Sequence, residues 1–321
     1  MAMAIGRRYI DRKLACIRLF LKLAQNIENL VFILKLFVRL GLWIFCPEVH
    51  IRNKSILAKK GALLVVANHP DSFLDAVIIG AYYPRKMHFL ARGDVFRKPI
   101  FGFLLRSIGM IPIHRAREGR EHLHLNAGTF DTSVDVLAKG GGILIFIEGI
   151  CLLTHELQPY KKGATRILEA AQQRGIQPMV HVIGIAYNDF RAFGKVVEIH
   201  VEELAHTPEL GHAKDRLDFN ARVFDQMRQL IHVPTKRMHV KRSLFYFLNY
   251  PYYRLIQSIA DSKTKGTVFY DSVLFAALFF TYPLYLVLLG TGLWLAGLPI
   301  WYVGFFVLIL PLGIRIQMRT K

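Results

Sequence analysis

The sequence predicts an α/β domain that carries apolar helices at both ends of the chain. Apolar strand-like runs alternate with helical segments between residues 47 and 210, which is typical of α/β proteins. Apolar residues make up 53% of the chain, enough for a large core with apolar surface left over. From Gly266 to Ile314 the only charged residue is Asp271, which indicates a segment that enters a membrane.

The first 46 residues are predicted to form amphipathic membrane-anchoring helices. Arg18, Lys22 and Gln25 fall on one narrow helical face, with apolar residues elsewhere. Lys35 and Arg39 interrupt the later apolar run, which disfavours a simple crossing of the bilayer and favours an in-plane or re-entrant anchor. The alternative is that these helices pack on the folded domain as ordinary amphipathic helices.

Residues 47–265 are predicted to form the α/β domain, with a basic helical extension over 205–240. The expected strands are 62–67, 87–91, 111–113, 142–147, 179–186 and 196–201. The expected helices are 71–82, 98–108, 126–139 and 162–174. Because helices connect most of these strands, we expect a mixed or parallel-rich sheet that is flanked by helices.

Residues 266–321 are predicted to form a transmembrane helical hairpin followed by a basic tail. Its two apolar segments are 272–290 and 298–314, joined by an uncharged connector. Lysines precede the hairpin and arginines follow it, so the positive-inside rule puts both of its ends in the cytoplasm. Asp271 lies at the edge of the first segment, and we expect it at the membrane interface.

Charge and cysteine usage narrow the classes of partner. The formal net charge of +19 suits an anionic membrane, because the basic residues flank apolar segments, and no nucleic-acid-binding motif is present. The three cysteines, Cys16, Cys46 and Cys151, are far apart and lack the spacing of a disulfide framework or a zinc site. We therefore expect a reducing, cytoplasm-facing protein without a metal centre.

The candidate reactive group is a histidine at the end of the first buried strand. Asn68 and His69 follow this strand, and Pro70 is expected to start a helix there, because proline is favoured at the first helical position. A carboxylate near a histidine can fix its tautomer and orientation, so that the ring acts as a general base. We predict that Asp75 is this carboxylate, with Asp71 as the alternative.

Charged residues also follow two other predicted strands, which supports a functional site at the strand ends. His114-Arg115 follows the strand at 111–113, and Glu148-Gly149 follows the strand at 142–147. A basic run, Lys161-Lys162-Gly163-Ala164-Thr165-Arg166, comes next, and Val182 to Tyr187 ends a later strand. In α/β folds, functional groups gather at the carboxyl ends of the strands.

These stretches, in this order over roughly residues 60–202, resemble the glycerophospholipid acyltransferase superfamily, the PlsC-type 1-acylglycerol-3-phosphate and glycerol-3-phosphate O-acyltransferases. The chain departs from the family pattern in three of its motifs, and in one of them the stretch Val182 to Tyr187 lacks the usual proline. Five residues separate His69 from Asp75 where the family usually has four. Ile150-Cys151-Leu152 replaces the usual Thr-Arg-Ser after the Glu-Gly pair.

The resemblance implies a role for each candidate residue. His69 would be the general base, Asp75 its orienting carboxylate, and Gly149 a site of close backbone approach for oxyanion donors. Glu148 would organise the acceptor site. The residues expected to bind a phosphate group are Arg115, Lys161, Lys162 and Arg166.

The reaction so implied moves a fatty acyl group from acyl-CoA or acyl carrier protein to a hydroxyl of glycerol-3-phosphate or a lysophospholipid, at the cytoplasmic face of a membrane. It needs no cofactor besides the acyl donor. The alternative is a catalytically silent membrane scaffold that binds anionic lipid, which the extra residue between His69 and Asp75 and the missing Thr-Arg after the Glu-Gly pair allow. A hydrolase using a serine is disfavoured, because the chain has no G-x-S-x-G motif.

Overall fold

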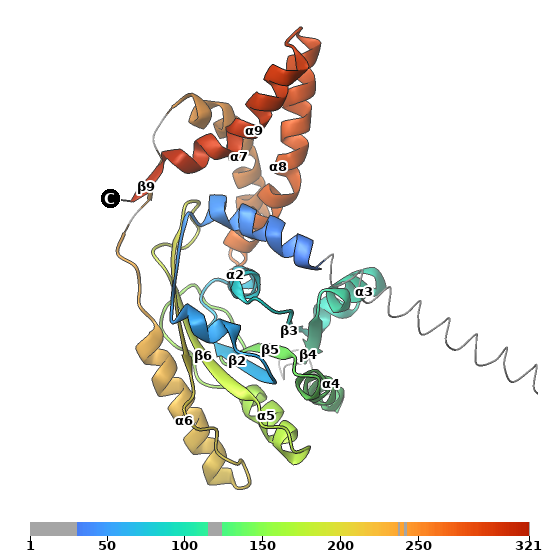
Figure 1. Cartoon of the computed structure of the whole chain (residues 1–321), viewed down its shortest axis with the longest axis vertical. Coiled ribbons are helices and arrows are strands. Elements are labelled where there is room, and N and C mark those ends of the chain that lie inside the picture. Colours follow the sequence, from blue (N-terminus) through green and yellow to red (C-terminus); the bar gives the residue numbers. More distant parts are fainter. Residues whose placement is uncertain (1–30, 115–123, 237, 241–242, 321) are drawn as a thin grey trace, which may run out of the picture.

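The structure, a computed structural model, is built on a central seven-stranded sheet (Figure 1). It describes residues 31–114, 124–236, 238–240 and 243–320. The sheet strands are β1 (Glu48–Arg52), β2 (Leu63–Ala67), β3 (Met87–Arg92), β4 (Met110–Ile113), β5 (Gly142–Phe146), β6 (Met179–Tyr187) and β7 (Val196–Glu203). Their order across the sheet is β1-β7-β6-β2-β5-β3-β4.

The sheet is mixed and mainly parallel, as the sequence predicts. β2 lies between β5 and β6 and runs parallel to both, and β3 runs parallel to β5 and β4. β7 pairs with β6 in the antiparallel sense, and β1 runs parallel to β7 at the edge. The sequence analysis missed β1, a short and partly exposed edge strand with charged residues at both ends.

Helices cover both faces of the sheet because successive side chains of the buried strands point to opposite sides. Leu63 and Val65 belong to one core cluster, while Leu64 and Val66 belong to the other. The second cluster packs against α4 (Asn126–Ala138), α5 (Gly163–Gln173) and α6 (Ala213–Leu230). The first packs against α2 (Phe73–Tyr82) and the helical residues 31–45.

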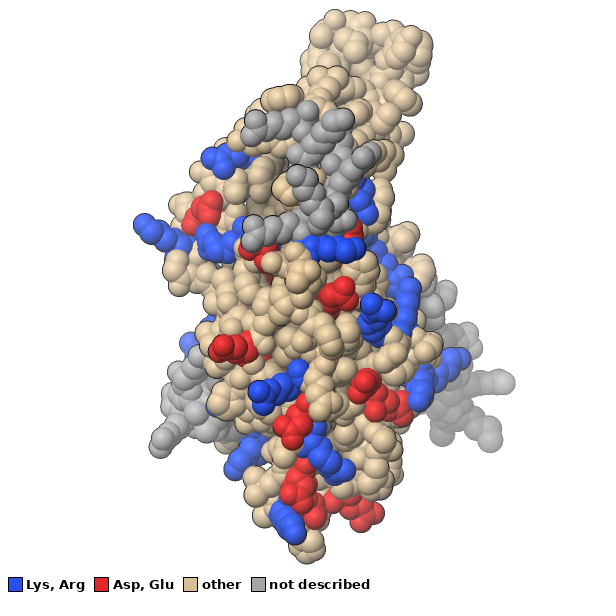
Figure 2. All heavy atoms as spheres, turned by 90° about the vertical axis from the view of Figure 1, so that its left-hand side faces the viewer, with Lys and Arg blue, Asp and Glu red and all other residues tan. Residues whose placement is uncertain are grey.

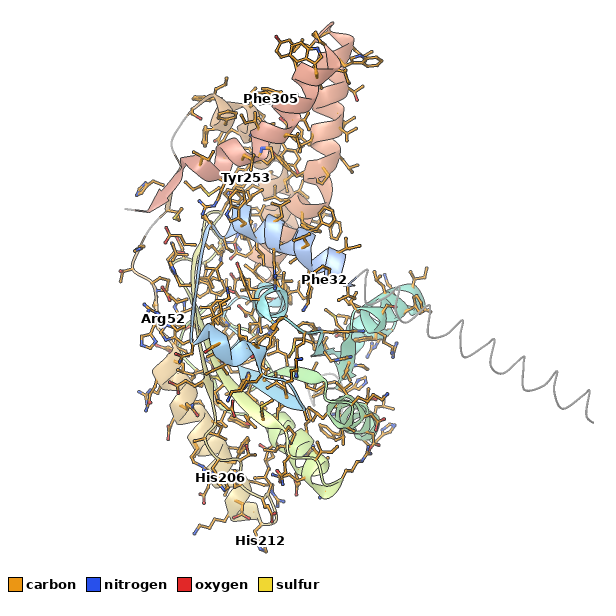
Figure 3. The ribbon with its side chains drawn as sticks, viewed as in Figure 1. Phe32, Arg52, His206, His212, Tyr253 and Phe305 are labelled. Atoms are coloured by element: carbon orange, nitrogen blue, oxygen red, sulfur yellow. The ribbon has the colours of Figure 1, made fainter. Side chains whose placement is uncertain are left out.

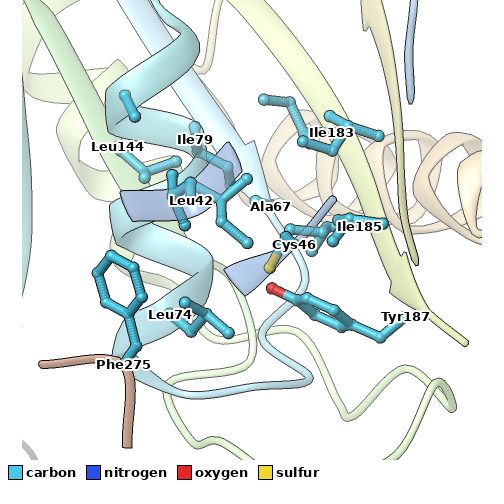
Figure 4. Packing of buried hydrophobic residues seen from close by; sticks show 14 of the residues in the cluster. Leu42, Cys46, Ala67, Leu74, Ile79, Leu144, Ile183, Ile185, Tyr187 and Phe275 are labelled. Carbon is cyan, nitrogen blue, oxygen red and sulfur yellow. The ribbon is translucent and has the colours of Figure 1, made fainter. Parts of the chain in front are cut away.

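The first core also includes the C-terminal helices α7 (Leu244–Thr264) and α8 (Tyr270–Leu295). Figure 4 shows Leu42, Leu74 and Phe275 packed beside residues of the strands. The predicted boundaries at residues 46 and 265 therefore fall between segments that share one core. They stay predictions.

The helical residues 31–45 pack on the folded domain on one side and expose apolar side chains on the other. Lys35 donates to the carbonyls of Tyr83 and Arg85, just beyond the end of α2, and Arg39 donates to the carbonyl of Ala81 in its last turn. The opposite side of the segment is apolar and exposed, and Phe32 is 72% accessible (Figure 3). The predicted anchor over residues 1–30 lies outside the described residues.

The C-terminal helices project from the sheet as the sequence predicts for the hairpin segments. α8 and α9 (Ile300–Gln317) pack against each other, with Phe305 exposed on α9 (Figure 3). Within the described residues, α8 is the one helix long and apolar enough to cross a membrane by length and composition. Figure 2 shows the projecting end without charged side chains, whereas charges are spread over the rest of that face.

Several smaller elements complete the described chain. They are α3 (Pro99–Ser107), the 3₁₀ turns η1 (Lys54–Ala58) and η2 (Gly93–Phe96), and the strand pair β8 (Met238–Val240) and β9 (Met318–Thr320). The basic helical extension predicted over 205–240 is shorter than expected. Among the described residues of this range, α6 alone is helical, and irregular segments flank it on both sides.

Candidate active site

The candidate site lies where β5, β2 and β6 end side by side. Because these three neighbours are parallel, their carboxyl ends meet at one edge of the sheet. His69 follows β2, Glu148 follows β5 and Tyr187 ends β6. The sheet order therefore brings together residues that are more than a hundred positions apart in the sequence.

His69 and Asp75 form a direct pair. His69 Nδ1 lies 2.8 Å from Asp75 Oδ2, the Asp75 side chain is fully buried, and the His69 side chain keeps 19% of its surface accessible. A carboxylate at Nδ1 fixes the tautomer in which Nδ1 donates, which leaves Nε2 unprotonated and able to accept a proton. Of the two candidate acids, the structure selects Asp75.

The extra residue between His69 and Asp75 is absorbed in the turn before α2. The helix begins at Phe73, so the expectation that Pro70 starts it is wrong. Ser72 takes a left-handed φ of 55°, and its carbonyl accepts from the backbone N–H of Asp75 at 3.2 Å. The backbone N–H of Asp71 then donates to Asp75 Oδ2 at 2.9 Å, which holds the carboxylate toward His69.

Asn68 anchors the other end of this turn. Its side-chain amide donates to the carbonyl of Ile185 and accepts from the N–H of the same residue, at 2.9 and 2.8 Å. The amide thereby extends the pairing of β2 with β6 by one residue beyond Ala67. His69 thus directly follows the residue that ties the end of β2 to β6.

Two aromatic residues that the sequence analysis did not assign complete the setting of the pair. The hydroxyl of Tyr187 donates to Asp75 Oδ1 at 2.6 Å, so both carboxylate oxygens are engaged. The ring of Phe146 stacks on the imidazole of His69, with centroids 3.8 Å apart and planes 9° from parallel. Both aromatics end buried parallel strands, a position that sequence alone could have flagged.

Glu148 and Gly149 lie at the same edge. Glu148 is buried, which raises its pKa to about 7; the backbone N–H groups of His69 and Gln158 oppose this shift, and the Asp75 carboxylate adds to it. Gly149 takes a left-handed φ of 61°, where an added Cβ would lie 3.2 Å from Cγ of Lys161. The backbone therefore approaches the Lys161 side chain closely here.

A buried ion triad lies behind the pair. Lys195 Nζ lies 2.6 Å from Asp71 Oδ2 and 2.7 Å from Asp271 Oδ2, and all three side chains are fully buried. Burial raises the pKa of Asp71, and the ammonium group of Lys195 opposes this shift. Burial alone would lower the pKa of Lys195, but the two carboxylates raise it above its ordinary value.

Asp271 is buried inside the protein, and its expected position at the membrane interface stays a prediction. This residue, near the start of α8, is 1% exposed and also accepts from the backbone N–H of Arg191 at 2.7 Å. Next to it, Ser272 Oγ accepts from the N–H of Leu74 in α2. The apolar composition around Asp271 indicated a membrane edge, but its charged partners come from distant loops.

The departure after the Glu-Gly pair has a structural role. Cys151 Sγ accepts from the backbone N–H of Ser72 at 3.0 Å, which supports the strained turn. Burial raises the pKa of the Cys151 thiol, so it stays protonated. His155 accepts through Nε2 from the N–H of Tyr187 at 3.1 Å.

Of the predicted phosphate-binding residues, one lies at the same sheet edge as Glu148 and Gly149, two belong to the start of α5, and one lies outside the described residues. Lys161 lies against Gly149, as described above, and its backbone N–H donates to the carbonyl of Ile147 at 2.7 Å. Lys162 is exposed just before α5, and Arg166 is exposed over the ring of Phe130 in α4. Arg115 follows β4, which β5 and β3 separate from β2, and it lies outside the described residues.

Over the ranges that the structure describes, no group of three histidine, cysteine, aspartate or glutamate side chains is arranged to hold a metal ion. The histidines, cysteine and carboxylates of the site instead bond to each other and to backbone groups.

Comparison with known proteins adds independent information. Residues 48–186 match the protein-family model described as Acyltransferase. A 1-acyl-sn-glycerol-3-phosphate acyltransferase from Helicobacter pylori is 32% identical over 126 residues, which cover 39% of this chain and 50% of the relative. One from Bacillus subtilis is 26% identical over 133 residues, covering 41% of this chain and 60% of the relative.

The chain thus spans about half the length of the curated relatives it matches. Among solved structures, the 1-acyl-sn-glycerophosphate (LPA) acyltransferase PlsC from Thermotoga maritima matches with a TM-score of 0.47 and 16% identity. That match covers 64% of this chain and 80% of the other.

Proposed function

Because residues 48–186 are an acyltransferase domain of the glycerophospholipid acyltransferase superfamily, we propose that the protein is a membrane-bound O-acyltransferase. It transfers a fatty acyl group from acyl-CoA or acyl carrier protein to a hydroxyl of a lysophospholipid or of glycerol-3-phosphate. The curated relatives named as 1-acyl-sn-glycerol-3-phosphate acyltransferases support a phosphate-bearing acceptor.

The observation that carries the proposal is the His69–Asp75 pair at the end of β2. Asp75 is held by Tyr187 and by the N–H of Asp71, so its position does not depend on the substrate. Phe146 fixes the plane of the imidazole ring. A preorganised base of this kind contributes about 10²–10⁴-fold to a rate.

In the proposed reaction, the acceptor hydroxyl gives its proton to Nε2 of His69 as its oxygen attacks the thioester carbonyl carbon. The tetrahedral intermediate carries a negative oxygen, and the family pattern assigns its stabilisation to backbone N–H groups near Gly149, whose own N–H donates to the carbonyl of Phe146 at 3.2 Å here. Its collapse breaks the carbon–sulfur bond, and the leaving thiolate takes the proton back from the imidazolium. Asp75 stabilises the imidazolium between these two proton transfers.

Recognition of the acceptor phosphate is assigned to the cations near this edge. Lys161 is supported by its place against Gly149, whereas Lys162, Arg166 and Arg115 are assigned from the family pattern. Arginine can bind a phosphate through two hydrogen bonds, and lysine acts as a point charge. Glu148 would orient the acceptor or one of these cations.

Membrane attachment through α8 would hold the site at the bilayer surface, where its lipid substrates are. The basic residues on both sides of the hairpin support an orientation with both of its ends, and the active site, on the cytoplasmic side.

The test is acyl transfer by the purified full-length protein in mixed micelles, with acyl-CoA and 1-acylglycerol-3-phosphate as substrates. His69→Ala should lower kcat/KM by about 10²-fold or more, because it removes the base. The matched control is His206→Ala, an exposed histidine at the far end of the molecule from the hairpin (Figure 3), which should leave the rate unchanged.

Equal rates for the wild type and His69→Ala would overturn the proposal and favour the silent lipid-binding scaffold. Free fatty acid without an acylated acceptor would indicate a hydrolase instead.

A further inference from the structure

A second site is formed by the helices outside the acyltransferase domain. A cavity of about 450 Å³ lies between residues 37–45, α7, α8 and α9. This volume falls within the range of roughly 300–1,000 Å³ that is common for small-molecule sites. The cavity is therefore large enough to hold part of a small molecule or of a lipid chain.

The walls of the cavity select an apolar occupant. They include Leu278, Leu286 and Phe279 of α8, together with aromatic side chains of α7. Two polar groups of the wall are bonded to each other, since the Tyr282 hydroxyl donates to Asn249 Oδ1 at 2.8 Å. A ligand with hydrogen-bonding groups would find few partners in such a wall, whereas an alkyl chain needs none.

The cavity opens on the apolar surface of the molecule. Phe37 and Leu40 line it and are also 57% and 52% exposed. On α8, which is long and apolar enough to cross a membrane, Leu284 and Leu288 are exposed next to lining residues. An alkyl chain in the surrounding bilayer would therefore meet the opening without crossing water.

The cavity is separate from the His69–Asp75 site. None of the residues that line it is His69, Asp75, Glu148 or Tyr187. Phe45, Phe193 and Phe275 form the wall on the side of the domain, and the backbone of Lys195 donates to the carbonyl of Phe45. This hydrogen bond places the buried triad next to the wall, on its domain side. An alkyl chain bound in the cavity would therefore not reach His69.

We propose that this cavity binds one alkyl chain of a bilayer phospholipid that does not react, and that the bound chain joins residues 31–45 to the C-terminal helices. This site is additional to the proposed acyl transfer. Its occupant is a phospholipid rather than the acyl donor, because the cavity faces the apolar surface and not the candidate active site.

The experiment uses the full-length protein reconstituted in vesicles that contain a phosphatidylcholine with a diazirine in one acyl chain. After illumination, mass spectrometry locates the labelled peptides. The wild type should carry label on lining residues of α7 and on the lining side of α8. Leu286→Trp fills the cavity and should lower this labelling about tenfold.

The matched control is Leu288→Trp, which adds the same side chain to an exposed position of the same helix and should keep the labelling. Leu278→Trp fills the cavity from another position and should repeat the loss, so a folding defect of one variant does not decide the result. In a parallel arm, acyl-CoA is added before illumination as a competitor. It should not lower the labelling by the phosphatidylcholine.

Equal labelling of the wild type and all three tryptophan variants would overturn the proposal. It would mean that the phospholipid contacts only the outer surface of the helices. Absence of label from the lining residues of the wild type would overturn it in favour of the chain's own residues 1–30. Displacement by acyl-CoA would assign the cavity to the reaction. A wild type without acyl transfer but with the expected labelling would contradict the proposed function and leave this inference standing.

Discussion

At the scale of single residues, the pair His69–Asp75 depends on a local backbone conformation that most side chains avoid. Ser72 adopts a left-handed φ of 55°, and Cys151 accepts a hydrogen bond from its N–H. Such conformations cost about 1–3 kcal/mol and persist when surrounding contacts hold them. Here they bring the carboxylate of Asp75 to Nδ1 of His69 across one additional residue.

Glu148 gives a prediction on pH at this scale. Burial raises the pKa of Glu148 to about 7 in the folded protein, above the usual value of 4.5 that it has in the unfolded chain. The folded state therefore binds the proton more tightly between these values, and wild-type stability falls as pH rises through this window. Glu148→Gln removes the titration.

The free energy of unfolding of Glu148→Gln, relative to the wild type, should thus rise by about 1–2 kcal/mol from about pH 5 to about pH 8. Denaturant unfolding in detergent micelles measures this difference. Glu156→Gln, an exposed glutamate of the same loop, should show no such change. A pH-independent difference for Glu148→Gln would contradict the assignment.

At the scale of elements, the buried triad joins three segments that are far apart in the chain. Asp71 belongs to the turn before α2, Lys195 precedes β7, and Asp271 begins the candidate span α8. A buried charge without a partner is costly, so each of these residues depends on the other two. The C-terminal helices are therefore tied to the same turn that carries the His69–Asp75 pair.

Lys195→Met tests this coupling. It leaves two buried carboxylates without a cation, and we expect a loss of about 3–5 kcal/mol in the free energy of unfolding. The triple variant Asp71→Asn, Lys195→Met, Asp271→Asn has no unpaired charge and should regain most of this stability. Thermal unfolding of both variants in micelles provides the comparison, and wild-type stability of the single variant would refute the coupling.

At the scale of the whole molecule, charge and apolar surface occupy different regions. The projecting end of α8 and α9 shows no charged side chains in Figure 2, and many of its exposed side chains are large and apolar. The formal net charge of +19 is carried by the rest of the chain. This separation suits a protein held by apolar contact with the bilayer and attracted to its anionic headgroups.

Membrane binding should therefore respond to salt in a specific way. Raising the salt from about 0.1 M to about 1 M shortens the Debye length from roughly 10 Å to 3 Å and should weaken recruitment to anionic vesicles. Protein already inserted should stay in the membrane pellet and require detergent for release, because apolar burial does not depend on charge screening. Release by salt alone would contradict insertion of the hairpin.

Part of this architecture could be predicted from the sequence because it depends on local patterns. Apolar runs identified β2, β5 and β6, helical periodicity identified α4 and α5, and the uncharged stretch identified the hairpin segments. The edge strand β1 was missed because its mixed polar composition carries no strong period. The start of α2 was misjudged because Pro70 fits both a helix start and a turn.

The sequence alone was sufficient for the α/β class, for His69 with a nearby acid, and for an apolar C-terminal hairpin, because periodicity and strand–helix junctions are encoded by near neighbours. The tertiary structure decided which acid pairs with His69, that Tyr187 and Phe146 hold this pair, and that Asp271 is a buried ion partner. These contacts depend on the order of strands in the sheet, which brings distant segments together and leaves no local pattern to read.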